Sequence, residues 1–360
     1  MSSSDRGTKP QSPITIDADG TITVPSFRLP LSTALSPEAS AYMAQLLGAR
    51  PSAEFVNFKA IQSEAAFRAA VDAFRAALDE GVAEPLAQEL LAAFPVDMKP
   101  ARIGGVAVEE FMRQGERDDD RVLINLHGGA FYSGATYVGR IESIPLCHLG
   151  RLRVISVDYR QGYEHKYPAA SEDVMAVYEA LLRSYPPSSI GIYGGSAGGI
   201  VTLQATAWIL AHGLPAPGAI GVFGAGAFAS GDGSYFAAIG SAQHPPMNPI
   251  PSLRIGKFGY FSDARFDDPL LDPTIAEEAF RAKFPPSLLI TGTRAFDLSP
   301  ALATHRALSQ AGAEASLHVF DGLGHCFYYQ AGLPEGRDAY RTMVRFFRKH
   351  LGRRSPRDLE

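Results

Sequence analysis

From about residue 102 onward, short runs of β-branched and aromatic residues alternate with segments long enough for a helix, and this alternation limits the fold more than any other feature. The runs lie at 105–112, 121–128, 153–159, 189–195, 219–224, 287–292 and 316–322. The last five are separated by room for crossover helices, which predicts a mostly parallel, doubly wound sheet of the α/β class. The first run is expected to form a hairpin and to run antiparallel at one edge of the sheet.

Two amphipathic helices are predicted before the first of these strands. Ser36 is a typical N-cap, with Pro37 at the first helical position and Gly48 as the stop signal. A second helix is predicted within 63–81, where the apolar residues Phe67, Val71, Phe74 and Leu78 share one face. Because an amphipathic face must be buried against a neighbour, we expect these helices to cover another part of the molecule as a cap.

The chain is therefore predicted to have two parts. Residues 1–100 form an N-terminal extension and helical cap, and residues 101–352 form the main domain, which contains the sheet. The stretch 240–256 is rich in Pro and Gly, which predicts a lid insertion near 230–280.

Composition excludes several classes of protein. A chain of 360 residues with 46% hydrophobic and 20% charged residues is typical of a globular enzyme-sized domain, and its net charge of −5 argues against nucleic-acid binding. Two cysteines, Cys147 and Cys326, do not form a disulfide framework. No run reaches the roughly 18 apolar residues of a membrane helix, and the polar first residues lack a signal-peptide core, so a cytoplasmic location is expected.

Chemically loaded residues follow several of the predicted strands. Ligands of open α/β sheets bind at the carboxyl ends of the strands, so these positions are the first candidates for a site. The segment after the strand at 189–195 has Ser196 in a G-x-S-x-G pattern, with Gly194 and Gly198 on either side. Small residues there let a strand and a helix approach closely around a sharp turn, which predicts an exposed nucleophilic serine with Ala197 at the helix start.

A Gly pair follows the strand at 121–128 in the segment His127-Gly128-Gly129. Acyl transfer requires N–H donors that converge on the developing oxyanion, and glycines expose such donors without a side chain. We predict an oxyanion hole made of the N–H groups of Gly128, Gly129 and Ala197. His127 is expected to brace this loop rather than to act as a base.

A base and an acid are predicted after the last two strands. His325 lies in a Gly-flanked loop after the final strand, which suits a general base. Asp297 is the only carboxylate in the loop after the strand at 287–292, and Ser299 is expected to cap the helix that follows. Ser196, Asp297 and His325 would then supply a nucleophile, an acid and a base at one edge of the sheet.

The chain resembles the hormone-sensitive-lipase-like esterases of the α/β-hydrolase superfamily over residues 102–350. The motifs that carry the resemblance are HGGAF at 127–131, DYR at 158–160 followed by YPAASED, GGSAGG at 194–199 and GLGHCF at 322–327. The resemblance implies a serine carboxylesterase that hydrolyses short- to medium-chain acyl esters through an acyl-enzyme, with no metal or cofactor. It also implies that the N-terminal segment forms a cap and that Asp158 and Arg160 are structural.

The sequence departs from the family pattern at three positions. Gly195 stands where the family usually has Asp or Thr, and Ile200 where Asn is frequent. Ala295 occupies the usual place of the catalytic acid, and Asp297 follows two residues later. Asp297 is therefore predicted as the acid, against the alternative of an exposed helix N-cap.

Other functions fit parts of the sequence. Gly224, Gly226 and Ala229 match the dinucleotide pattern G-x-G-x-x-A, but the required acidic residue about 20 positions later is missing. Within the family, lactones or acetylated small molecules are alternative substrates, and a non-catalytic receptor on the same fold is an alternative of another class. Phe131, Tyr132, Phe228 and Tyr235 are candidates for an acyl or alcohol pocket or for the core. The resemblance also allows for a homodimer formed through an edge strand.

Overall fold

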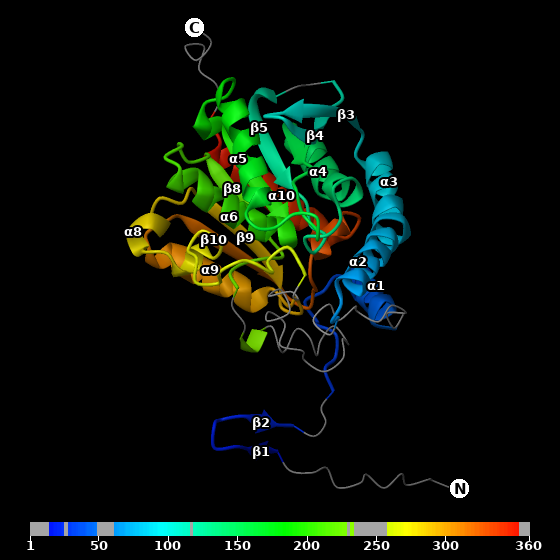
Figure 1. Ribbon diagram of the computed structural model, residues 1–360. Coiled ribbons are helices and arrows are strands. Elements are labelled where there is room, and N and C mark those ends of the chain that lie inside the picture. Colours follow the sequence, from blue (N-terminus) through cyan, green and yellow to red (C-terminus); the bar gives the residue numbers. More distant parts are fainter. Residues whose placement is uncertain are drawn as a thin grey trace, which may run out of the picture.

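The computed structural model describes residues 14–24, 28–48, 61–115, 118–228, 231–233 and 258–352. Within these residues the main sheet has eight strands in the order β10-β9-β8-β7-β5-β6-β4-β3 (Figure 1). Their bounds are β3 Val96–Ile103, β4 Val106–Arg113, β5 Asp118–Leu126, β6 Leu152–Val157, β7 Ile190–Gly195, β8 Ala219–Phe223, β9 Ser287–Gly292 and β10 Ala315–Phe320. Strands β5 to β10 pair in parallel, which confirms the predicted mostly parallel α/β sheet.

The edge hairpin consists of β3 and β4. β4 pairs antiparallel with both β3 and β6, so β3 is the edge strand. The sequence did not predict β3, because Asp97, Lys99 and Pro100 interrupt its apolar pattern. An edge strand exposes one side to solvent and tolerates these residues, including a proline.

Helices cover both faces of the sheet, and alternate residues of a strand point to different layers. On one side lie α5 (Ala169–Leu182), α6 (Ala197–Ala211) and α9 (Leu298–Gln310), in one apolar cluster with Val122 and Ile124 of β5. On the other side lie α4 (Tyr137–Gly150) and α10 (Pro334–His350), in a second cluster with Leu123. Burial on both faces explains why the parallel strands read as nearly continuous apolar runs.

The N-terminal helices lie along one side of this sandwich (Figure 1). They are α1 (Pro37–Gly48), α2 (Glu64–Leu78), a π-helical turn η2 (Asp79–Ala83) and α3 (Glu84–Ala93). The predicted start of α1 is confirmed, since the Ser36 Oγ accepts a hydrogen bond from the Ala39 N–H at 3.1 Å. α3 was not predicted because Gly81 and Pro85 read as helix-ending residues, whereas the chain continues through the π-turn.

The apolar face of α2 is buried, as its spacing predicts. Phe67 and Val71 are fully buried and pack against Tyr132, which follows the HGGA segment. The predicted division at residue 100 remains a prediction, and β3 begins five residues before 101, at Val96. Of the predicted lid insertion near 230–280, residues 230 and 234–257 lie outside the described residues.

The remaining elements are short. They are β1 (Thr15–Ile16), β2 (Ile22–Thr23), α8 (Glu278–Arg281) and the 3-10 turns η3 (Pro187–Ser189), η4 (Pro273–Ile275) and η5 (Phe327–Tyr329). In the described part of the chain, no helix combines the length and apolar character needed to cross a membrane.

Candidate active site

Ser196 lies at a sharp turn between β7 and α6. Its φ of 54° and ψ of −122° are strained for a residue with a side chain. The turn requires glycine on both sides, because a Cβ on Gly194 would lie 2.3 Å from the Leu126 carbonyl oxygen and one on Gly198 would lie 1.7 Å from it. Ser196 is half-buried, while every other residue from Ile190 to Ile200 is buried, so its hydroxyl is the accessible group of the turn.

The structure brings the three predicted catalytic side chains together from distant parts of the chain. The His325 Nε2 lies 2.9 Å from the Ser196 Oγ, and the His325 Nδ1 lies 2.6 Å from the Asp297 Oδ1. These contacts join the end of β7, the start of α9 and the loop after β10. The imidazole therefore lies within proton-transfer distance of the hydroxyl and is oriented by a carboxylate.

Asp297 is held in place by a second hydrogen bond. Its Oδ2 accepts from the Thr291 hydroxyl at 2.5 Å, and only 2% of its side chain is exposed. The predicted cap at Ser299 is wrong, since α9 begins at Leu298 and Asp297 itself occupies the N-cap position without a side-chain bond to the helix. Ala295, in the family's usual acid position, is fully buried.

The surroundings of His325 alter its basicity. Partial burial lowers the pKa of the imidazole, but its contacts with Cys326 and Asp297 outweigh this effect and raise the pKa to about 10. The Cys326 Sγ lies 3.5 Å from the His325 Nε2 and also accepts from the Tyr328 hydroxyl at 3.4 Å. The imidazolium formed during proton transfer is thus stabilised by its neighbours.

The loop after β5 turns sharply beside Ser196. Gly129, Ala130 and Phe131 have positive φ values of 122°, 57° and 66°. A Cβ on Gly128 would lie 3.2 Å from the Ser196 Cβ, so this loop and the serine turn are in close contact. Two consecutive non-glycine residues in the left-handed region cost roughly 1–3 kcal/mol each and need external support.

The predicted oxyanion hole requires one correction. The Gly128 N–H donates to the Glu142 Oε1 at 3.0 Å, so it is not available to an oxyanion. Among the described residues, no hydrogen-bond acceptor is found for the N–H groups of Gly129, Ala130 and Ala197. The positive φ of Ala130 and the engagement of Gly128 by Glu142 are tertiary features with no local sequence signal.

His127 supports the loop after β5. It is fully buried and stacks on Tyr159 with ring centroids 4.3 Å apart, and its Nδ1 lies 2.7 Å from the Gly128 carbonyl oxygen. Burial lowers the pKa of His127 to about 4, so the ring is neutral at physiological pH. These contacts agree with the predicted bracing role.

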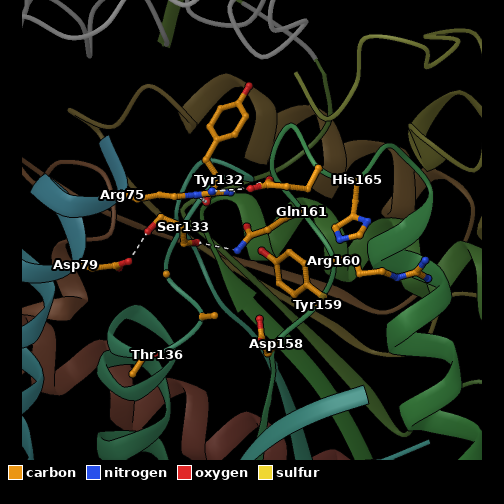
Figure 2. A pocket seen from close by; sticks show the side chains of 13 residues that line it. Arg75, Asp79, Tyr132, Ser133, Thr136, Asp158, Tyr159, Arg160, Gln161 and His165 are labelled. Atoms are coloured by element: carbon orange, nitrogen blue, oxygen red, sulfur yellow. Dashed lines mark hydrogen bonds and ion pairs between the residues drawn. The ribbon is translucent and has the colours of Figure 1, made fainter. Parts of the chain in front are cut away.

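A polar cleft of about 550 Å³ lies between the end of α2 and the loops at 132–136 and 158–165 (Figure 2). Within it, the Arg75 Nε donates to the Tyr132 carbonyl oxygen at 2.6 Å, and the Arg75 guanidinium pairs with Glu164 at 2.7 and 2.9 Å. The Ser133 hydroxyl donates to Asp79 at 2.8 Å. The N-terminal helices thus hold the strained loop from outside.

The DYR segment lies on the same side. Asp158 lines the cleft, and Arg160 pairs with Asp173 through its Nε at 2.9 Å and its backbone N–H at 2.8 Å. Phe131 and Tyr132 are buried, Phe131 against Tyr260 and Phe261. Phe228 packs on Phe261 and Phe266, and Tyr235 lies outside the described residues.

The glycines of the dinucleotide-like pattern have packing roles. A Cβ on Gly224 would lie 2.8 Å from the Cys326 Sγ, and one on Gly226 would lie 2.3 Å from the Pro300 carbonyl. Both glycines therefore allow the segment after β8 to approach the His325 loop and α9.

Known proteins of similar sequence indicate the family of this chain. A profile described as alpha/beta hydrolase fold matches residues 123–329, which is more than half of the chain. This chain belongs to the alpha/beta hydrolase fold family. This α/β-hydrolase is 25% identical over 271 residues to an esterase of Acinetobacter venetianus, covering 73% of this chain and 86% of that protein. It is 27% identical over 238 residues to an acetyl-hydrolase of Streptomyces hygroscopicus, covering 66% and 78%.

Solved structures of esterases have the same fold as this chain. The crystal structure of esterase E25 matches this α/β-hydrolase with a TM-score of 0.79 and 28% identity, covering 92% of this chain and 99% of that one. An esterase from the bacterial hormone-sensitive lipase family matches with a TM-score of 0.69 and 25% identity, covering 89% and 100%. The resemblance to hormone-sensitive-lipase-like esterases is confirmed by these matches. Within the described ranges, no group of three or more His, Cys, Asp or Glu side chains could hold a metal ion.

Proposed function

We propose that this α/β-hydrolase is a serine carboxylesterase that hydrolyses short- to medium-chain acyl esters. The observation that carries the proposal is the position of His325, whose two ring nitrogens lie 2.9 Å from the Ser196 Oγ and 2.6 Å from the Asp297 Oδ1. The similarity to esterases and an acetyl-hydrolase supports the same class of reaction.

In the proposed reaction, the Ser196 Oγ attacks the ester carbonyl while its proton moves to the His325 Nε2. Asp297 stabilises the imidazolium. The N–H groups of Gly129, Ala130 and Ala197 bind the oxyanion, and the imidazolium then protonates the leaving alkoxide. The released alcohol leaves an acyl-Ser196 ester, which water cleaves by the same sequence with His325 as the base.

The similarity to an acetyl-hydrolase of Streptomyces hygroscopicus favours acetyl esters of small molecules within the proposed range. A series of p-nitrophenyl esters from acetate to decanoate measures the preferred acyl length.

The experiment that tests the reaction compares wild type with Ser196→Ala and His325→Ala on p-nitrophenyl acetate and butyrate. Each substitution is expected to lower kcat/KM by at least about 10³-fold, because each removes a group that acts in the transition state. His305→Ala and Ser309→Ala, which alter a hydrogen-bonded pair on α9, serve as controls and should keep wild-type turnover. Equal turnover in Ser196→Ala and wild type would refute the proposal, and ester binding without turnover in wild type would favour the receptor function.

A further inference from the structure

Glu142 is a carboxylate that the proposed reaction does not use. It lies on α4 with 2% of its surface exposed, and in the described part of the chain no Lys, Arg or His forms an ion pair with it. A buried charge without a cation is costly unless hydrogen bonds replace its hydration. The groups that donate to this carboxylate therefore indicate its role.

Four donors converge on the two oxygens of Glu142. The Oε1 accepts from the Gly128 N–H at 3.0 Å and from the Tyr329 hydroxyl at 2.5 Å. The Oε2 accepts from the Asn125 amide at 2.8 Å and from the Gly195 N–H at 3.3 Å. All four partners are donors, which matches the acceptor capacity of an ionised carboxylate.

Three of these donors belong to the segments that form the site. Gly128 begins the loop after β5 at residues 128–131, which we call the oxyanion loop. Gly195 directly precedes Ser196, and Tyr329 follows His325 by four residues. We propose that Glu142 is a positioning residue that links the oxyanion loop, the serine turn and the His325 segment through one carboxylate. The inference rests on the proposed ester hydrolysis, and it adds a residue that touches none of the reacting atoms.

The residue before Ser196 supports this role. A Cβ on Gly195 would lie 2.5 Å from the Glu142 Oε1 and 2.6 Å from the Tyr328 hydroxyl oxygen. The carboxylate therefore occupies the space that a side chain at position 195 would need. A side chain at position 195, such as the Asp or Thr of the family pattern, would collide with this carboxylate.

Burial raises the pKa of Glu142 above its ordinary value, while the hydrogen bonds from Tyr329, Asn125, Gly128 and Gly195 counteract that rise. Protonation would convert one acceptor oxygen into a donor and leave one of the four groups without its partner. A glutamine at this position has the same shape and the same defect. Glu142→Gln therefore tests the hydrogen-bond network without creating a cavity.

In Glu142→Gln, we expect kcat for p-nitrophenyl butyrate to fall about 10- to 100-fold with KM within about threefold of wild type, because small displacements of reacting groups cost rate rather than ground-state binding. Affinity for a trifluoromethyl ketone, which forms a tetrahedral adduct with the serine, should fall in parallel with kcat. A smaller fraction of folded protein would also lower the apparent kcat at unchanged KM, but it would leave the affinity of the remaining active sites for the ketone unchanged. Glu109→Gln is the matched control, because it alters a pairing of α4 with β4 through Arg140 and does not touch the three segments.

Tyr329→Phe is the second variant, and it removes a single hydroxyl from the network. It should lower kcat by about 3- to 10-fold with KM within about threefold of wild type. Combined with Glu142→Gln it should add less than about threefold, since both variants break the bond between Tyr329 and Glu142. If Glu142→Gln does not fold, the kcat of Tyr329→Phe by itself tests the positioning role of Glu142. Wild-type kcat in either folded single variant, or fully additive effects, would overturn the positioning role. Inactive wild type, or active Ser196→Ala, would instead refute the proposed function.

Discussion

At the scale of single residues, Asp297 shows how tertiary contacts redirect a side chain. Its backbone occupies the N-cap of α9, where an aspartate usually accepts a bond from the helix. Here both oxygens are engaged elsewhere, one with His325 and the other with Thr291. The helix start still favours the negative charge through its dipole, so the same position stabilises an ionised acid beside the imidazole.

The first prediction concerns the pH dependence that this contact creates. The contacts with Cys326 and Asp297 raise the pKa of His325, and only the neutral imidazole accepts the Ser196 proton. kcat/KM should therefore increase as the pH rises toward about 10. In Asp297→Asn the ascending limb should move to lower pH, and the rate should fall by about 10³- to 10⁴-fold.

A pH–rate profile of p-nitrophenyl butyrate hydrolysis measures both effects. Asp267→Asn is the control, because Asp267 is an exposed carboxylate paired with Arg265. An ascending limb that stays at the wild-type pH in Asp297→Asn would show that Asp297 does not act on the base.

At the scale of elements, the oxyanion loop depends on helix α2. Ala130 and Phe131 hold positive φ values that an isolated loop would avoid. Arg75 holds the next residue through the Tyr132 carbonyl and is itself fixed by two bonds to Glu164 (Figure 2). Helix α2 therefore contributes to the geometry of this loop.

The second prediction is that Arg75→Ala lowers kcat/KM by about 10-fold, since a loop that relaxes by a fraction of an ångström misdirects its N–H groups. Arg68→Ala is the matched control on the same helix. Arg68 is half exposed, pairs with Glu64 four residues before it and lies over the Tyr163 ring as Arg75 does, but among the described residues it makes no hydrogen bond to the loop after β5. Steady-state kinetics on p-nitrophenyl butyrate compare the two. Equal activities of the two variants would contradict the supporting role of Arg75.

At the scale of the whole molecule, the segment before α1 contacts the loops after β9 and β10 and the start of α10. The Ser36 backbone N–H and hydroxyl donate to Glu335, at the start of α10, at 2.7 and 3.0 Å. Ser32 donates to Asp321 in the loop that leads to His325, and Arg294 donates to the Pro30 carbonyl. The N-terminal segment is thus fastened to the same edge of the sheet that bears the acid and the base.

The third prediction compares the stability that Ser36 contributes as a helix cap with the stability it contributes through its bond to Glu335. Ser36→Ala should lower the free energy of unfolding by about 1–2 kcal/mol, because it removes a helix cap and a bond to Glu335. Ser63→Ala removes only the cap of α2, whose Oγ accepts from Ala66 at 3.3 Å, and should cost about half as much. Urea denaturation measures both values, and equal losses would argue against the link.

Local sequence patterns determined the elements of this protein and the identity of its main chemical groups. The seven predicted strands coincide with β4 to β10 because apolar runs of this length must be buried within a sheet. The residues after the strands, Ser196, Asp297 and His325, could be chosen in advance because all carboxyl ends of parallel strands meet at one edge.

Tertiary structure alone decided how the loop after β5 is held. The engagement of the Gly128 N–H depends on Glu142, 14 residues away on a helix, and Ala130 has a positive φ that alanine does not favour. The sequence patterns of β3 and α3 are weak or interrupted, so contacts with neighbouring elements determine that these segments form a strand and a helix. Such features are set by contacts between residues distant in sequence, and periodicity along the chain contains no record of those contacts.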